Sequence, residues 1–166
     1  INTVAFSSEG FLASGDQVGN IYVYDTSSFN LQETLTDPSS VNVNSVAFGG
    51  GFLAAGSSDN NVYVYDTSQF NLQETLTESN SPVESVALTT EGFLAVGSAS
   101  TDDEVNVYDT ENFNLQKTLS DSDDDVKSVA FSNEGFLAAA TGFGDQKTYV
   151  YSTGNFTLEQ TLTDFS

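Results

Sequence analysis

The sequence is built from one phrase repeated four times. Residues 22–36 read YVYDTSSFNLQETLT, and residues 63–77 repeat them with only Ser28 replaced by Gln69. Looser copies follow, and the units align on a short apolar triplet that begins at Val4, Val46, Val86 and Val129. The steps between these valines are 42, 40 and 43 residues. A period near 40 indicates stacked supersecondary units, so the repeat must be interpreted before any other feature.

Each unit contains four short apolar segments separated by turn-forming residues. In the second unit they are 43–48, 51–56, 61–66 and 70–77. These lengths are typical of strands rather than helices. In the third segment Val62 and Val64 alternate with Tyr63 and Tyr65, so both faces are apolar. Such a strand is expected to lie between two neighbouring sheets.

The fourth segment has a different pattern. Phe70, Leu72 and Leu76 are predicted to share one face, with polar residues alternating on the other. Glu74 interrupts the apolar face, and a charge there is one known guard against edge-to-edge pairing. We therefore expect the fourth strand to be the outermost strand of its sheet.

Four-stranded sheets that recur every 40 residues or so predict an all-β fold, the radial β-propeller. The chain resembles the WD40 family at Val46–Phe48, at Phe52–Asp59 and at Val62–Asp66, which follow the family's path through its first three strands. The resemblance extends over all four units. It implies four complete four-stranded blades, at about 1–40, 41–81, 82–124 and 125–166, within one propeller unit spanning 1–166.

Several positions depart from the family pattern. The family's Trp-Asp pair is replaced by Tyr24-Asp25, Tyr65-Asp66, Tyr108-Asp109 and Tyr151-Ser152. The family's turn aspartate is matched by Asp59, Asp102 and Asp145, with Val18 in the first unit, and its strand serine only by Ser14. The family's Gly-His pair is absent from every unit. In the family a His, a Ser or Thr, an Asp and the Trp can form a hydrogen-bonded network, and we expect that network to be missing here. The blades should then be held mainly by apolar burial, and each buried tyrosine hydroxyl needs a hydrogen-bond partner.

The charge of the chain is extreme. There are 24 acidic residues and three lysines, with no arginine or histidine, giving a formal charge of -21. Salt screens such repulsion, with a Debye length of about 8 Å at physiological ionic strength and about 3 Å at 1 M. The composition predicts a soluble protein of a high-salt, halophilic environment. The regular placement of 13 Phe and 7 Tyr argues against intrinsic disorder.

Charge and composition exclude several functions. Three lysines cannot form the basic footprint that nucleic acids or anionic membranes require. Without His or Cys the chain has no conventional catalytic triad or thiolate zinc site. We expect a protein that is not an enzyme and has no cofactor, although paired carboxylates leave an acidic-site hydrolase as a remote alternative.

Calcium is the one metal for which the sequence offers candidate ligands. The candidate ligands lie in two acidic loops and are Asp121, Asp123 and Asp125 in one, and Asp102 and Asp103 in the other. The first loop lacks the glycine and the twelfth-position glutamate of an EF-hand. Solvated acidic loops are the favoured interpretation.

The sequence leaves several ways for the blades to form a closed ring. The family usually has seven or eight blades, and this chain supplies four. Two copies could pair head to tail into an eight-bladed ring, four blades could close alone, or the chain could belong to a longer one. The homodimer is favoured because an open half-ring would expose two apolar blade faces.

The expected function is a non-catalytic scaffold whose loops or central mouth bind proteins or peptides, with a preference for a cationic partner. The alternative is a repeat-derived or engineered propeller fragment with no dedicated ligand. The turns after the second segment of each unit differ in length, and Phe143 is the only aromatic residue in them. The run Gly49–Gly51 is predicted to be a hairpin turn rather than a phosphate-binding loop.

Overall fold

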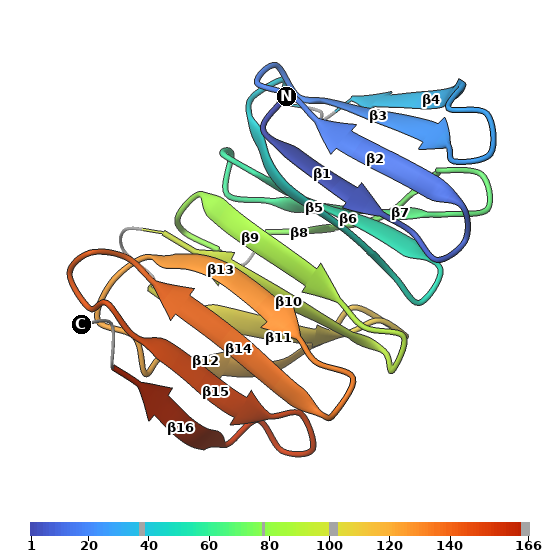
Figure 1. Ribbon diagram of the computed structural model, residues 1–166. Coiled ribbons are helices and arrows are strands. Elements are labelled where there is room, and N and C mark those ends of the chain that lie inside the picture. Colours follow the sequence, from blue (N-terminus) through green and yellow to red (C-terminus); the bar gives the residue numbers. More distant parts are fainter. Residues whose placement is uncertain (37–38, 78, 100–102, 164–166) are drawn as a thin grey trace.

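The computed structural model describes residues 1–36, 39–77, 79–99 and 103–163. Every regular element in these ranges is a strand, and the sixteen strands form four antiparallel sheets of four strands each (Figure 1). Within each sheet the strands follow one another in chain order. The predicted all-β architecture of four blades is confirmed.

The four blades have closely similar strand boundaries. Blade 1 contains β1 (Thr3–Phe6), β2 (Phe11–Gly15), β3 (Asn20–Asp25) and β4 (Leu31–Thr36). Blade 2 contains β5 (Val43–Gly49), β6 (Phe52–Ser57), β7 (Val62–Asp66) and β8 (Leu72–Leu76). Blade 3 contains β9 (Val83–Leu88), β10 (Phe93–Ser98), β11 (Val105–Asp109) and β12 (Leu115–Leu119). Blade 4 contains β13 (Val126–Phe131), β14 (Phe136–Thr141), β15 (Thr148–Ser152) and β16 (Leu158–Leu162).

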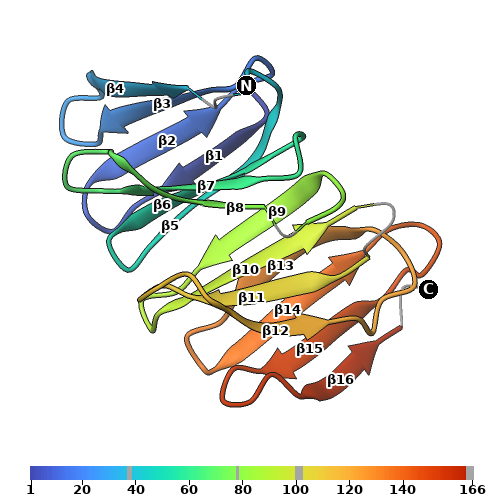
Figure 2. The same ribbon diagram turned by 180° about the vertical axis from the view of Figure 1, so that it is seen from behind.

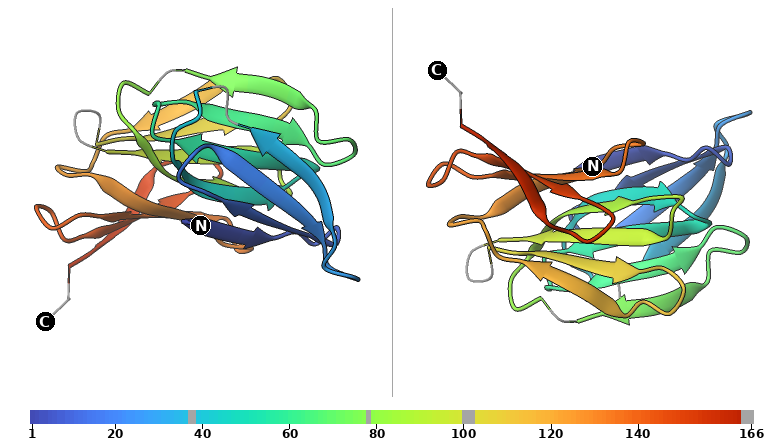
Figure 3. Two further views of the ribbon diagram at one scale, coloured as in Figure 1. Left: turned by 90° about the horizontal axis from the view of Figure 1, so that it is seen from above. Right: turned by 90° about the horizontal axis from the view of Figure 1, so that it is seen from below.

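The blades fan out from the inner strands β1, β5, β9 and β13. Seen from behind (Figure 2) and from above and below (Figure 3), blades 2 and 3 lie on one side, while blades 1 and 4 form the two ends of an open arc. The fourth strand of each blade is the outermost, as predicted.

The core consists of three hydrophobic clusters, one between each pair of neighbouring blades. On β7 the two faces serve different clusters, because Tyr63 and Tyr65 pack towards blade 1 while Val62 and Val64 pack towards blade 3. Strands of blades 2 and 3 are therefore apolar on both faces, because each of these blades lies between two neighbours.

The two ends of the arc lack this cover. No hydrophobic cluster of described residues joins blade 4 to blade 1. Val4 is 64% exposed, whereas Val46, at the same position in blade 2, is 6% exposed. The four blades therefore do not close into a small ring by themselves, which was one of the three alternatives left open by the sequence.

The fourth strands are shorter than expected. Phe70 lies in the turn before β8 with φ of 56°, not in the strand, and Leu72 is 46% exposed. A register shift between Val64 and Tyr65 causes this difference, because one extra residue on β8 there breaks the simple alternation of faces. Of the apolar face expected in this segment, only Leu76 is buried.

Glycine lets neighbouring blades approach closely at the end of their second strands. A Cβ added to Gly15 would lie 2.5 Å from Val43 Cγ1, and one added to Gly56 would lie 2.5 Å from Val83 Cγ1. Gly97 has the same relationship with Val126, at 2.7 Å. A larger residue at these positions would therefore have to push the next blade away.

Candidate functional site at the mouth of the arc

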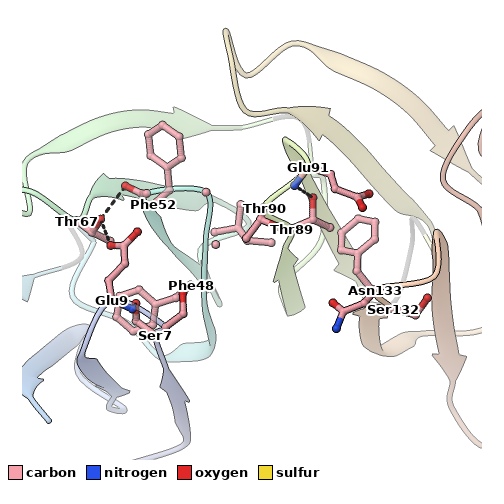
Figure 4. A pocket seen from close by; sticks show the side chains of 16 residues that line it. Ser7, Glu9, Phe48, Phe52, Thr67, Thr89, Thr90, Glu91, Ser132 and Asn133 are labelled. Carbon is pink, nitrogen blue, oxygen red and sulfur yellow. Dashed lines mark hydrogen bonds between the residues drawn. The ribbon is translucent and has the colours of Figure 1, made fainter.

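A pocket of about 400 Å³ lies where the turns between the first and second strands of all four blades meet (Figure 4). These turns begin at the inner strands, so the fan of blades brings them together at one mouth. The lining residues come from 7–9, 48–52, 88–91 and 131–133, with Thr67 from the turn after β7. Every blade contributes to this pocket.

Short hydrogen bonds within and between blades shape this mouth. Thr67 of blade 2 donates from Oγ1 to Glu9 Oε2 of blade 1 at 2.6 Å, and the same oxygen lies 3.0 Å from the Gly51 carbonyl (Figure 4). In blade 3 the Glu91 amide donates to Thr89 Oγ1 at 3.1 Å. These turns are fixed by their own hydroxyl groups, so they present a preformed surface.

The electrostatic character of the mouth is acidic. Glu9 and Glu91 are exposed and lie on opposite sides of the pocket, and no lysine lines it. Phe48, Phe52 and Phe131 supply apolar walls among serine and threonine hydroxyls. The chemistry suits a positively charged group with an aliphatic stem. The two carboxylates do not face each other as a catalytic pair in Figure 4.

Asp25, Asp66 and Asp109, which follow the family's tryptophan position, organise the turns before the outer strands. Asp25 Oδ1 accepts hydrogen bonds from the Ser27 amide at 2.7 Å and the Ser27 hydroxyl at 2.6 Å. Such bonds lower the pKa of Asp25, and likewise of Asp66, to about 2. In blade 4 the Ser152 hydroxyl donates to Asn155 Oδ1 at 2.6 Å instead.

The turn aspartates bind a tyrosine that sequence reasoning passed over. Tyr63 donates to Asp59 Oδ2 at 2.6 Å, and Tyr149 donates to Asp145 Oδ2 at 2.8 Å. In blade 1 Tyr22 donates to Asp16 Oδ2 at 3.1 Å. This tyrosine precedes the tryptophan position by two residues.

In blade 1, Asp16 takes the part that the sequence alignment gave to Val18. Burial alone would raise the pKa of Asp16, but hydrogen bonds from Asn20, the Val18 amide and Tyr22 lower it to about 2. In blade 3, Asn106 stands in place of the tyrosine and accepts from Thr118 at 2.7 Å. Asp102 lies outside the described residues.

Three of the tyrosines at the tryptophan position are buried, as their place between blades requires. Tyr65, Tyr108 and Tyr151 are all at most 5% exposed, whereas Tyr24 is only half-buried because no described blade packs on that face of blade 1. Burial and the neighbouring Asp121 carboxylate raise the pKa of Tyr151. Asp121 therefore lies beside a core tyrosine.

The calcium candidates are not brought together. Asp125 Oδ2 lies 2.7 Å from Lys127 Nζ, while Asp121 and Asp123 are exposed in the turn before β13. Asp103 is in the turn before β11, and its neighbour Asp102 is not described. Within the ranges that the structure describes, no three acidic side chains are placed to share a metal ion.

Comparison with known sequence families finds a match over one segment of the chain. Residues 29–66 match the WD40 family, described as "WD domain, G-beta repeat". This segment of the chain therefore matches one WD40 repeat. The matched segment covers β4 to β7 and so joins the outer strand of blade 1 to the first three strands of blade 2. WD40 propellers are generally non-catalytic scaffolds for protein interactions.

Solved structures share the fold over nearly all of the chain. A chain in a structure titled "Crystal Structure of Mitotic Checkpoint Complex" matches with a TM-score of 0.87 and 23% identity. The match covers 98% of this chain and 51% of that one, so this chain spans about half the length of its match. No curated protein sequence matches significantly. Structural similarity extends to 1489 chains, so the fold alone selects no partner.

The residues that line the mouth pocket were not predicted. The sequence drew attention to the turns between the second and third strands, where Phe143 is 94% exposed. Those turns lie at the opposite end of the sheets, and the pocket is formed by hairpin turns such as Gly49–Gly51. A glutamate before the turn glycine, as at Glu9 and Glu91, was the available signal. No helix among the described residues has the length and apolar character of a membrane span.

Proposed function

We propose that this WD40 chain is a non-catalytic interaction scaffold whose mouth pocket binds a basic segment of another protein. The observation that carries the proposal is the convergence of turns from all four blades on one pocket with two exposed glutamates and no cation. A lysine or arginine side chain fits there because its aliphatic stem can lie on Phe48 or Phe131 while its charge approaches a carboxylate.

The charge of the whole chain supports the same partner. A formal charge of -21 steers positively charged segments towards the protein and repels acidic ones. Steering and rim ion pairs are both screened by salt. Binding of a basic partner should therefore be strongest at low ionic strength and weaken steadily as salt is added.

The proposal can be tested with a lysine-rich octapeptide titrated into the chain by calorimetry at 50 mM and 500 mM KCl. The Glu9→Gln and Glu91→Gln variants should each weaken binding by up to about fivefold, because exposed ion pairs contribute about 0.2–1 kcal/mol. In Glu9→Gln the side-chain amide oxygen can still accept the hydrogen bond from Thr67, so the mouth should keep its shape.

The matched control is Glu74→Gln on the outer strand β8, which removes the same charge from an exposed position away from the pocket. A mouth site requires Glu74→Gln to bind like the original chain. Equal losses in all three variants would mean diffuse attraction to an acidic surface. Absence of binding at 50 mM KCl would favour the alternative of a repeat module with no dedicated ligand.

We further propose that the scaffold works as a complete ring, with a second copy of the chain supplying the missing blades. The exposure of Val4 at one end of the arc supports this, because its equivalents inside the chain are buried against a preceding blade. A high-salt setting fits the same proposal, since concentrated salt would screen repulsion between two acidic copies.

A further inference from the structure

We infer that the end face of blade 4 docks on the end face of blade 1 of a second copy, and that a cross-copy pair of Phe136 and Phe29 anchors this fourth interface. The inference rests on the proposed two-copy ring and specifies its contacts. Each proposed contact has an equivalent at all three interfaces between blades of the same chain.

The aromatic contact shows the pattern most clearly. At every internal interface, the phenylalanine that begins the second strand meets, edge to face, the phenylalanine in the last turn of the next blade. The pairs are Phe11–Phe70, Phe52–Phe113 and Phe93–Phe156, with ring centroids 5.1–5.2 Å apart and planes at 79–89°. The remaining members are Phe136, which is 41% exposed, and Phe29, which is 63% exposed.

The backbone at Phe29 strengthens this inference. Phe29 has φ of 52°, and its three equivalents have φ of 53–57°. A bulky residue in this left-handed region is a genuine outlier that costs about 1–3 kcal/mol. At the three internal positions, packing of the ring on the preceding blade offsets that cost. Phe29 has the same strained conformation, and its stacking partner is missing from the described part of its own chain.

A hydrogen bond between inner strands repeats in the same way. The Val46 amide donates to Thr3 Oγ1, the Val86 amide to Ser45 Oγ and the Val129 amide to Ser85 Oγ, each at 3.1 Å. The two members left over are the amide of Val4 and the hydroxyl of Ser128, at opposite ends of the arc. Ser128 is exposed, as is Val4. Docking of the two end faces would bring these groups together.

One position sets the strength of the fourth interface. Where blades 1 to 3 have glycine at the point of closest approach, blade 4 has Ala140. Its methyl group would press on Ile1 of the second copy, which occupies the position of Val43. The fourth interface should therefore be the loosest of the four, and Ala140→Gly should tighten it.

Two ion pairs lie at this end face, because Lys127 pairs with Asp125 and Lys147 pairs with Asp145. A groove of about 500 Å³ on blade 4 is lined by Lys127, Lys147 and Ala140 among others. Two of the three lysines of the chain thus lie where a second acidic copy would approach. The remaining repulsion between copies should be screened by salt, so association should strengthen as salt is added.

The test is the molar mass of the chain by sedimentation equilibrium in 2 M KCl, over a range of protein concentrations. A mass of twice 17.7 kDa is expected at high concentration, with dissociation to single chains on dilution. Single chains at every concentration, or an assembly larger than two, would overturn the inference.

Two variants test the contacts themselves. Phe29→Asn removes the ring and suits the left-handed backbone, so the single chain should keep its fold while association weakens at least tenfold. Ala140→Gly should strengthen association, a gain that misfolding cannot imitate. An unchanged dissociation constant for Phe29→Asn would show that copies associate through another surface.

Opposite salt responses keep the two proposals separate. Peptide binding at the mouth should weaken with added KCl, and pairing of copies should strengthen. A chain that binds the octapeptide but stays single in 2 M KCl would preserve the scaffold and overturn the interface. A chain that pairs without binding the peptide would do the reverse.

Discussion

The ring of Phe11 meets the ring of Phe70 edge to face, with centroids 5.1 Å apart and planes at 83°. Phe11 begins the second strand of blade 1, and Phe70 lies in the last turn of blade 2, where its backbone is strained. The same relationship at each internal interface means that neighbouring blades are held by ring packing as well as by their inner strands.

The cost of losing one such ring depends on which blade carries it. Phe156→Ala should lower the free energy of unfolding by about 3 kcal/mol, because Phe156 is 8% exposed and packs on Phe93. Phe29→Ala is the matched variant at the equivalent exposed position. Urea unfolding of dilute single chains should show less than about 1 kcal/mol for Phe29→Ala. Similar losses in both variants would contradict the open arc.

Close approach at the glycine positions gives a second prediction. Gly56→Ala should destabilise the chain by about 1–3 kcal/mol, because its Cβ would lie 2.5 Å from the side chain of buried Val83. Gly154→Ala is the control, since a Cβ there meets nothing within 4 Å. Thermal unfolding in the same buffer compares the two. Equal melting temperatures would mean that blades 2 and 3 are not packed as described.

The tyrosine and aspartate pairs give a third prediction. Tyr63→Phe removes the hydroxyl that donates to Asp59 at 2.6 Å, so stability should fall by about 1 kcal/mol. Burial acts to raise the pKa of Asp59, but hydrogen bonds from Ser39, Tyr63 and other donors lower it. The variant should therefore move the pKa of Asp59 upwards, measured by NMR titration. A pKa that stays in place would show that this hydroxyl does not stabilise the carboxylate.

Acid should weaken the turns that aspartates organise. The pKa values of Asp25 and Asp66 are about 2, below their ordinary value of 3.8, because serine hydroxyls and backbone amides donate to them. Since the folded state lowers these pKa values, the stability they contribute is fully present above pH 4 and is lost as pH falls towards 2.

The measurement is the melting temperature between pH 5 and pH 2 in 2 M KCl, where repulsion between carboxylates is screened. The original chain should lose stability over this range. The double variant Asp25→Asn and Asp66→Asn should start lower and show a shallower decline. Parallel curves for the two proteins would mean that these carboxylates do not report on folding.

Much of the architecture could be predicted from the sequence, because the period near 40 residues and the strand-length segments constrain each other. The alternation of Val62 and Val64 with Tyr63 and Tyr65 correctly placed β7 between two neighbours. The place of Phe70 was wrong, because the extra residue opposite Tyr65 depends on backbone hydrogen bonding that alternation does not encode.

The candidate site was less predictable. The hydrogen bond from Tyr22 to Asp16 was missed because the comparison with the family considered only the tryptophan position. Tyr22 lies two residues before that position, and the sequence alone does not show that its hydroxyl group reaches the turn. The lining residues of the mouth pocket were not identified, because Glu9 and Glu91 belong to ordinary hairpin turns. These turns converge because of the way the four blades are arranged, and the sequence of a single repeat carries no information about that arrangement.

The most direct test of the account is a crystal structure of the chain grown from molar potassium chloride. We predict eight blades in a closed ring of two copies, with Phe29 of one copy edge to face against Phe136 of the other. A structure in which these two rings stay exposed, or in which blade 1 of each copy meets blade 1 of the other, would contradict the account.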